Sequence, residues 1–287
     1  MVSNCNVFST GLLEGCTQMR GPAVLLSVVL LLSCLPASGQ QPISARDELN
    51  LGVEAYRQAR FDEAIKHFKN ATSLEPSLVV AHLYLATAFA QQYIPGAETQ
   101  ENVRVGEQAI EEYKRVLDLD PNSPSASNAV KGIATLYFNM KKFDDSKQYH
   151  KLAIERDPDD ADEHYALGVI DWTLAYEVRI ARMAELHLEM SSPLINEPAC
   201  ADVRRANEDN VEEGIAELTK ALKLRPDYDD AMAYMNLLYR ERADIHCGDP
   251  AAYAADLKKA DEWVDRTMAT KKAKAERARS GEEREPH

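Results

Sequence analysis

The sequence predicts an all-α solenoid of about five stacked helical hairpins, and two observations lead to this prediction. The stretch from Ala45 to Leu78 carries two amphipathic helical patterns separated by a short break, with apolar residues recurring at helical spacing in each half. A proline that ends the second helix of such a unit recurs at Pro76, Pro121, Pro158 and Pro226. Because a hairpin with one apolar side needs a neighbour to cover it, the copies are expected to stack.

The first unit, residues 45–78, resembles the tetratricopeptide repeat family at the positions that define its repeat. The matching residues are a Leu-Gly pair, an aromatic residue at the turn, an alanine, a second aromatic residue, another alanine and a closing proline: Leu51, Gly52, Phe61, Ala64, Phe68, Ala71 and Pro76. Small residues let two helices approach closely, and aromatic side chains fill the space between them. The resemblance implies a right-handed superhelix whose concave face binds peptides or partner proteins.

The next two units, expected at residues 79–123 and 127–160, differ in length. In the second unit 23 positions separate Ala86 from Ala109, whereas 12 positions separate Gly52 from Ala64 in the first. This difference predicts an insertion of about eleven residues between the two helices of the second hairpin. The third unit keeps the shorter spacing of the first.

The fourth unit, expected at residues 161–228, carries a larger insertion. Here 46 positions separate Gly168 from Gly214, which indicates about 34 inserted residues. We expect a further helix around Ile180 to Met190, because the apolar residues there follow a helical pattern that breaks at Ser191 to Pro193. A less regular fifth unit is expected at residues 229–269. The charged stretch 270–287 has no apolar stripe and is expected to be disordered.

Residues 1–39 predict export. The apolar run from Ala23 to Leu32 follows Arg20 and precedes small residues, which indicates a secretory signal cleaved before Gln40, with residues 40–44 as a short linker. Translation is hypothesised to start at Met19. The run is shorter than the ~20 apolar residues that cross a membrane. Alternatively, residues 31–34 resemble a bacterial lipoprotein box in which Cys34 carries a lipid anchor. Either route predicts a periplasmic or envelope-associated protein.

Charge and motifs narrow the class of function. The 287 residues include 33 Lys and Arg against 47 Asp and Glu, a net charge of −14, which argues against nucleic acid or an anionic membrane surface as the main partner. The sequence lacks a phosphate-binding glycine loop, a nucleophile elbow, paired-cysteine zinc spacing and a His-Glu-x-x-His motif. We therefore predict no enzyme, no cofactor and no metal site. A small-ligand or enzymatic pocket under the fourth-repeat insertion stays open as an alternative.

Two cysteines, Cys200 and Cys247, remain after the predicted cleavage before Gln40. In a solenoid of hairpins the within-hairpin connections lie along one edge, and both cysteines fall in such connections of adjacent repeats. In an oxidising compartment we therefore expect them to form a disulfide.

The resemblance also assigns a binding face, the concave face lined by the first helix of each repeat. Matching this chain to the family pattern places there Tyr56, Arg57, Leu83, Gln91, Lys131, Phe138, Asn139, Tyr165, Trp172 and Arg240. The insertions are expected to bring Tyr93, Ile94, Pro95 and Tyr176 to its rim. Leu49 and Val53 stand where some members carry a clamp for a partner's C-terminal carboxylate, so that mode is disfavoured. The predicted function is a non-enzymatic exported scaffold that binds a protein or peptide partner in the bacterial envelope; the alternative is a lipoprotein of a membrane-assembly complex.

Overall fold

The computed structural model describes residues 43–189, 193–194 and 197–280, and every element within these ranges is a helix. The helices are α1 (Ala45–Arg57), α2 (Phe61–Leu74), α3 (Val79–Gln92), α4 (Gln100–Leu119), α5 (Pro124–Asn139), α6 (Phe143–Arg156), α7 (Ala161–Glu185), α8 (Glu197–Leu224), α9 (Asp229–Asp244) and α10 (Pro250–Ser280). The predicted signal segment 1–39 with Met19 and Cys34, most of the linker 40–44, and residues 281–287 lie outside the described residues.

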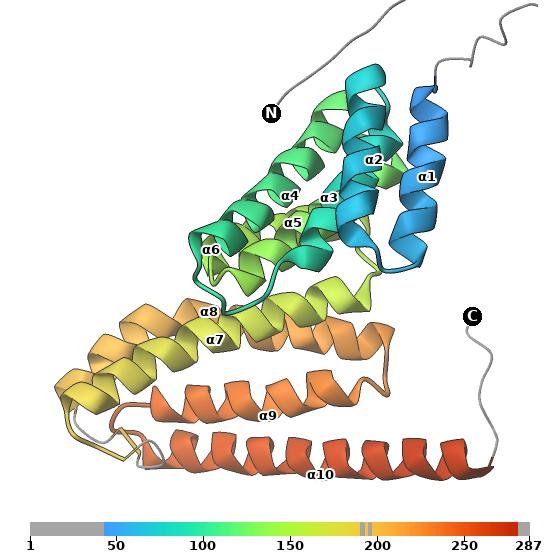
Figure 1. Ribbon diagram of the computed structural model, residues 1–287. Helices are drawn as coiled ribbons and strands as arrows, with labels where there is room; N and C mark the ends of the chain where they lie inside the picture. Colours follow the sequence, from blue (N-terminus) through green and yellow to red (C-terminus); the bar gives the residue numbers. More distant parts are fainter. Residues whose placement is uncertain (1–42, 190–192, 195–196, 281–287) are drawn as a thin grey trace, which may run out of the picture. The chain divides into compact units, whose positions relative to one another are not determined.

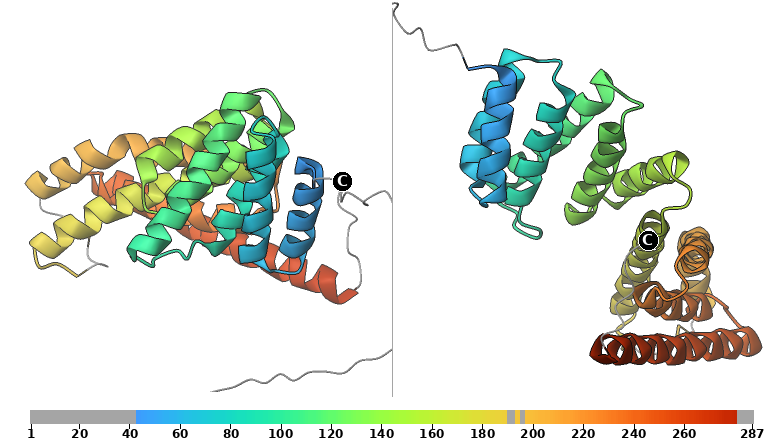
Figure 2. Two further views of the ribbon diagram at one scale, coloured as in Figure 1. Left: turned by 45° about the horizontal axis from the view of Figure 1, so that its top comes forward. Right: turned by 90° about the vertical axis from the view of Figure 1, so that its right-hand side faces the viewer.

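Consecutive helices pair into hairpins, α1 with α2, α3 with α4, α5 with α6, α7 with α8 and α9 with α10. Each hairpin also packs on the next one, and Figures 1 and 2 show the order of the stack. First helices additionally contact one another, α3 with α5 and α7 with α9. The predicted α-solenoid of helical hairpins is confirmed.

The predicted close approach of helices within a hairpin is present in the first repeat. A Cβ atom added at Gly52 would lie 2.4 Å from Cε1 of Phe68, and Phe68 itself is fully buried. The corresponding glycine of the fourth repeat, Gly168, meets Leu218 in the same way, with 2.4 Å between an added Cβ and Cγ. These glycines therefore set the helix spacing, because any side chain would push the hairpin apart.

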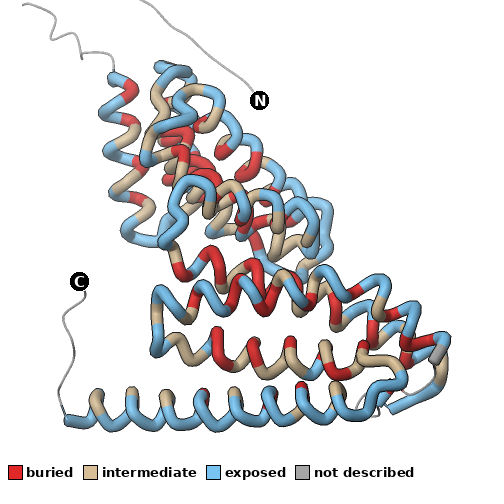
Figure 3. The backbone as a smooth tube through the Cα atoms, turned by 180° about the vertical axis from the view of Figure 1, so that it is seen from behind, coloured by how far each residue is buried: buried red, intermediate tan, exposed pale blue. Residues whose placement is uncertain are grey.

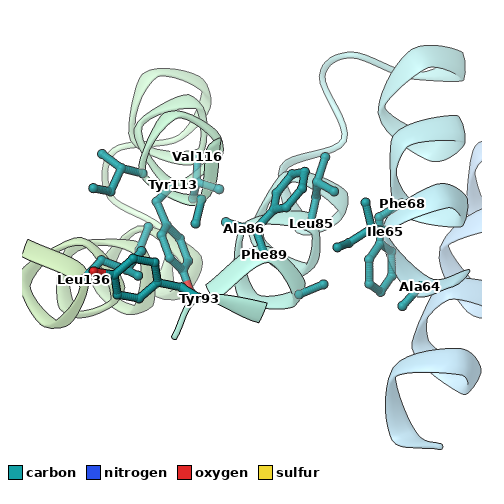
Figure 4. Packing of buried hydrophobic residues seen from close by; sticks show 14 of the residues in the cluster. Ala64, Ile65, Phe68, Leu85, Ala86, Phe89, Tyr93, Tyr113, Val116 and Leu136 are labelled. Carbon is teal, nitrogen blue, oxygen red and sulfur yellow. The ribbon is translucent and has the colours of Figure 1, made fainter. Parts of the chain in front are cut away.

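The core consists of two apolar clusters. The first joins buried residues of the first three hairpins, among them Phe68, Leu85, Tyr113 and Ile133, and Figure 4 shows part of this packing. The second lies within α7 to α10 and includes Leu238. Figure 3 shows the buried positions lining the helix contacts while the outer turns are exposed.

The fourth-repeat insertion lengthens existing helices, which corrects the expectation of a separate helix around Ile180 to Met190. The part of this segment up to Glu185 belongs to α7, a helix of 25 residues, and α8 has 28 residues. The reason is register: Met183 is 1% exposed and joins the same apolar cluster as Ala175. Because these residues continue the buried face of α7, the helix extends without a break.

The second-repeat insertion forms a loop and an extended α4. Helix α4 has 20 residues, compared with 14 in α2. Tyr93, which we expected at the rim of the groove, is instead buried, and its ring lies against Gly106. The expectation for Tyr93 was therefore wrong, because this side chain anchors the loop to α4.

The C-terminal boundary was expected too early. Instead of becoming disordered at residue 270, α10 continues to Ser280. Lys274 forms an ion pair with Asp229, Lys271 Nζ lies 3.7 Å from Asp229 Oδ2, and Arg277 lies 3.6 Å from Asp227 Oδ2. The segment lacks an apolar stripe, but its cations pair with carboxylates at the start of α9 and just before it.

Candidate functional site

A cluster of aromatic side chains lies between the first helices of the last two repeats, α7 and α9. Its members are Tyr165, Trp172, Tyr176, Tyr228 and Tyr234, which we call the α7–α9 aromatic cluster; each is partly exposed. Four of the rings belong to α7 and α9, which pack against each other and lie side by side in Figure 1, and Tyr228 directly precedes α9. Three of its members, Tyr165, Trp172 and Tyr176, were predicted from sequence.

The rings of the cluster form one connected set. The ring centroids of Tyr165 and Tyr228 are 4.8 Å apart, and those of Tyr165 and Tyr234 are 5.7 Å apart. Trp172 stacks on Tyr176 at 5.1 Å and meets Tyr234 at 5.4 Å. The planes of Tyr165 and Trp172 are inclined to Tyr234 by 79° and 77°, the edge-to-face geometry that aromatic pairs favour.

Arginines cover both ends of the cluster. The guanidinium carbon of Arg225 lies 4.4 Å from the Tyr228 ring centroid, and that of Arg179 lies 5.5 Å from the Tyr176 centroid. Arg225 donates to Asp162 at 2.8 and 2.9 Å. Both ends are therefore built around a cation held on a tyrosine face.

A carboxylate accompanies the middle of the cluster. Burial raises the pKa of Tyr165 to about 12, with the nearby Tyr234 and the Asp230 carboxylate adding to the effect. Burial, followed by Asp230, also raises the pKa of Tyr234. These phenols therefore stay protonated at neutral pH, and the fixed charge beside them is that of Asp230.

The other predicted groove residues do not join this cluster. Lys131 forms an ion pair with Asp160 at the start of α7. Arg240 reaches Asp261 of α10 at 2.7 Å, so it faces the last helix. Ile94 is 63% exposed in the α3–α4 loop.

Three further predicted residues contact neighbours within or between the first repeats. Tyr56 packs edge-on against Phe61 at 5.3 Å between centroids. Phe138 packs on Phe143 at 5.7 Å, which closes the third hairpin. The backbone oxygen of Asn139 accepts a hydrogen bond from the Tyr93 hydroxyl at 3.4 Å.

A second part of the first-helix face is a hollow between α3 and α5. It measures about 470 Å³ and is lined by Val80, Leu83, Tyr84, Thr87, Tyr113, Ser125 and Asn128. Leu83 was among the predicted groove residues. The lining carries no charged side chain, so this hollow suits neutral or apolar groups.

Tyr228 and Tyr234 were missed from sequence. Tyr165 and Trp172 lie seven positions apart, which puts them on one face of α7, but that spacing does not identify their partners on another helix. The sequence did contain a signal for these partners, namely aromatic residues near the start of α9, because the resemblance to the repeat family places that helix beside α7.

Cys200 and Cys247 lie beside a separate hollow of about 270 Å³. The structure joins the two cysteines by a disulfide with 5.6 Å between their Cα atoms. Leu194, Asp244 and Tyr253 also line this hollow, which lies at the end of the lengthened fourth hairpin. Within the part of the chain that the structure describes, no group of side chains suited to holding a metal occurs.

The lengths and composition of the helices bear on membrane contact as well. None of the described helices combines the length and the apolar character that crossing a bilayer requires.

The fold and this face define a class, the helical-repeat proteins that present a groove built from successive hairpins. Two tetratricopeptide repeat family models match the sequence, one over residues 49–124 and one over residues 132–160. The chain belongs to the tetratricopeptide repeat family. Comparison with curated proteins finds no significant match.

Solved structures with the same fold are distant in sequence. A crystal structure of MamA protein is 15% identical with a TM-score of 0.54, covering 81% of this chain and 94% of that chain. MamA 41-end from Desulfovibrio magneticus RS-1 is 16% identical with a TM-score of 0.53, covering 80% and 96%. YrrB, described as a TPR protein with an unusual peptide-binding site, is 12% identical with a TM-score of 0.51, covering 81% and 92%. These likenesses establish a shared fold.

Proposed function

We propose that this protein is a non-enzymatic exported scaffold that holds a protein or peptide partner on the face formed by its first helices. The observation that carries the proposal is the α7–α9 aromatic cluster, five partly exposed rings on one surface. Tyr and Trp dominate the energetics of protein interfaces, because they bury a large area and lose little side-chain entropy on binding.

The neutral hollow between α3 and α5 supports the same proposal. An extended segment that reaches this hollow finds Asn128 and Ser125 as hydrogen-bonding groups beside apolar walls. The YrrB structure, which is described as having a peptide-binding site, is consistent with peptide binding on this fold.

The test is partner capture from envelope extracts with variants of the face. Trp172→Ala and Tyr165→Ala are expected to reduce capture, because each truncation removes a large aromatic contact. A tyrosine-to-alanine change at a partly exposed position outside the face, Tyr149→Ala, is the matched control and is expected to retain capture. Circular dichroism establishes that each variant stays folded. Capture that survives both α7 substitutions in folded protein rules out this face.

Ile94→Asp tests the rim separately. Ile94 is 63% exposed, so a charge there disturbs no core packing. Reduced capture would extend the contact surface to the α3–α4 loop, and unchanged capture would confine it to the first helices.

Export is the second part of the proposal, and it rests on the predicted signal. The mature protein is expected in the periplasm or at the envelope, beginning at Gln40 or at a lipidated Cys34. Intact mass of protein purified from its own host distinguishes these two forms. A mature species that retains residues 23–32 overturns export by either route.

A further inference from the structure

We infer that the partner segment seated on the α7–α9 aromatic cluster is basic, with an arginine or lysine side chain over the rings of Tyr165, Trp172 and Tyr234 and paired with Asp230. The inference rests on the proposed function, which assigns this cluster to partner binding. It adds the chemical class of the partner.

The first step is that the cluster already holds guanidinium groups of its own chain. Arg225 lies on the Tyr228 face and Arg179 on the Tyr176 face. Each arginine is also bound by a carboxylate, Arg225 by Asp162 and Arg179 by Glu241, the latter at 2.7 and 2.9 Å. Both ends therefore combine a tyrosine face, a cation and a carboxylate.

The middle of the cluster has two of these three parts. Asp230 supplies the carboxylate, because it lies one helical turn before Tyr234 on the same face of α9, and its charge adds to the rise that burial causes in the pKa of Tyr165 and Tyr234. Among the residues the structure describes, no lysine or arginine is stacked on Tyr165, Trp172 or Tyr234. A cation from a partner would complete there the arrangement found at both ends.

The Asp230 carboxylate is available for such a cation. Its side chain is 64% exposed, and the nearest cation, Lys271 Nζ, is 3.9 Å away. The adjacent Asp229 is instead paired with Lys274 and is only 17% exposed. Asp230 can therefore bind a second cation without losing a buried contact.

The rings of the cluster offer electron-rich faces as well as apolar contact area. The Tyr234 plane stands nearly perpendicular to those of Tyr165 and Trp172. Cations are attracted to aromatic faces, and a desolvated site strengthens this attraction.

An acidic partner fits poorly. It would bring a carboxylate against Asp230, and the nearby arginines, Arg225 and Arg179, already bind Asp162 and Glu241. Like-charge contacts of this kind disfavour a partner. The net charge of −14 over the sequence acts in the same direction.

The experiment titrates the mature protein with three synthetic peptides of equal length. The peptides are identical except at one set of positions, which carries Arg in the first, Gln in the second and Glu in the third. The Arg peptide is expected to bind, and the Gln peptide to bind about three- to thirty-fold more weakly, as loss of a cation–π contact implies. Asp230→Asn and Tyr234→Leu are each expected to weaken the Arg peptide by a similar factor.

Two controls separate this site from general attraction to an acidic protein. Asp261→Asn removes a carboxylate that is 71% exposed on α10. Tyr137→Leu removes a tyrosine flanked by Lys114 and Lys142, each 5.9 Å from its ring centroid. Both variants are expected to bind the Arg peptide like the unsubstituted protein. Equal weakening by Asp230→Asn and Asp261→Asn overturns the inference.

The remaining outcomes separate the inference from the proposed function. If Gln or Glu peptides bind as tightly as the Arg peptide and Tyr234→Leu abolishes their binding, the basic class is wrong while the face stands. If no peptide binds and partner capture is unaffected by Tyr234→Leu, both are wrong. Circular dichroism of each variant excludes loss of folding as the cause.

Discussion

The Nζ atom of Lys147 in α6 lies 2.5 Å from Oδ1 of Asp171 in α7 and 2.7 Å from Oε2 of Glu213 in α8. One ammonium group thus joins the third hairpin to both helices of the fourth. Asp171 is fully buried, and its second oxygen, Oδ2, has no hydrogen-bond partner. Nearby, His150 Nδ1 lies 2.7 Å from Glu163 Oε2. Charged contacts therefore connect the third hairpin to the fourth, at the boundary between the two apolar clusters.

This junction predicts a pH dependence of stability. Burial raises the pKa of Asp171 to about 6, well above the usual value of an aspartate, although Lys147 acts against that shift. Because the folded chain holds this proton more tightly than the unfolded chain, the contribution of Asp171 to the free energy of unfolding grows as pH falls from 7 toward 4. It grows by about 1.4 kcal/mol for each pH unit between pH 6 and pH 4, where the unfolded chain also begins to bind the proton.

The measurement compares the unsubstituted protein with Asp171→Asn by urea unfolding at pH 7 and pH 5. Taking the difference between the two proteins cancels the other titrating groups, among them Asp244, whose pKa burial also raises to about 6. The unsubstituted protein should gain roughly 1 kcal/mol relative to the variant at pH 5. A difference that does not change with pH contradicts the assignment.

The Cys200–Cys247 bond predicts stabilisation of the last two hairpins. The two residues are 47 positions apart, and closing a loop of that length stabilises by about 4 kcal/mol in the chain-entropy model. Replacing both cysteines by serine should lower the urea midpoint by a corresponding amount. Thiol titration of denatured protein purified without reductant provides the direct check, and two free thiols would show that the bond is absent.

Gly52→Ala and Gly168→Ala should both destabilise the protein. Alanine gains about 1 kcal/mol of helix propensity over glycine, but overpacking a filled core costs about 1 to 3 kcal/mol or more. The added Cβ would lie 2.4 Å from a fully buried Phe68 or a fully buried Leu218, so the packing cost should exceed the gain. Thermal unfolding measures the result.

Leu51→Ala is the matched control for the first glycine, since Leu51 is its neighbour and is 47% exposed. Its effect should stay near ±0.5 kcal/mol, roughly the range of surface substitutions. Equal or higher stability of Gly52→Ala would show that Phe68 can move aside.

The end of α10 should contribute a small, salt-sensitive stabilisation. Lys274 is 40% exposed where it pairs with Asp229, and exposed ion pairs are worth about 0 to 1 kcal/mol. Lys274→Ala should lower the melting temperature slightly in low salt and have less effect in high salt, because ions screen the pair. Lys272→Ala, at a 78% exposed position, should change neither value. An equal effect of the two substitutions would contradict a specific contact with α9.

Much of the fold follows from local patterns in the sequence. The helical hairpins, the glycine contacts at Gly52 and the closing prolines are determined within one repeat, so periodicity and residue size predict them. Three rings of the aromatic cluster were also named from the sequence: the resemblance to the repeat family placed Tyr165 and Trp172 on the concave face, and the fourth-repeat insertion placed Tyr176 at its rim.

The sequence by itself therefore determined the repeat and the number of repeats. Only the tertiary structure decided which side chains meet: Tyr234 with Trp172 across two helices, Lys147 with Asp171 across two hairpins, and Lys274 with Asp229 at the end of α10. It also decided that the fourth-repeat insertion lengthens α7 and α8. Each outcome depends on a partner distant in the sequence, and local spacing contains no information about that partner.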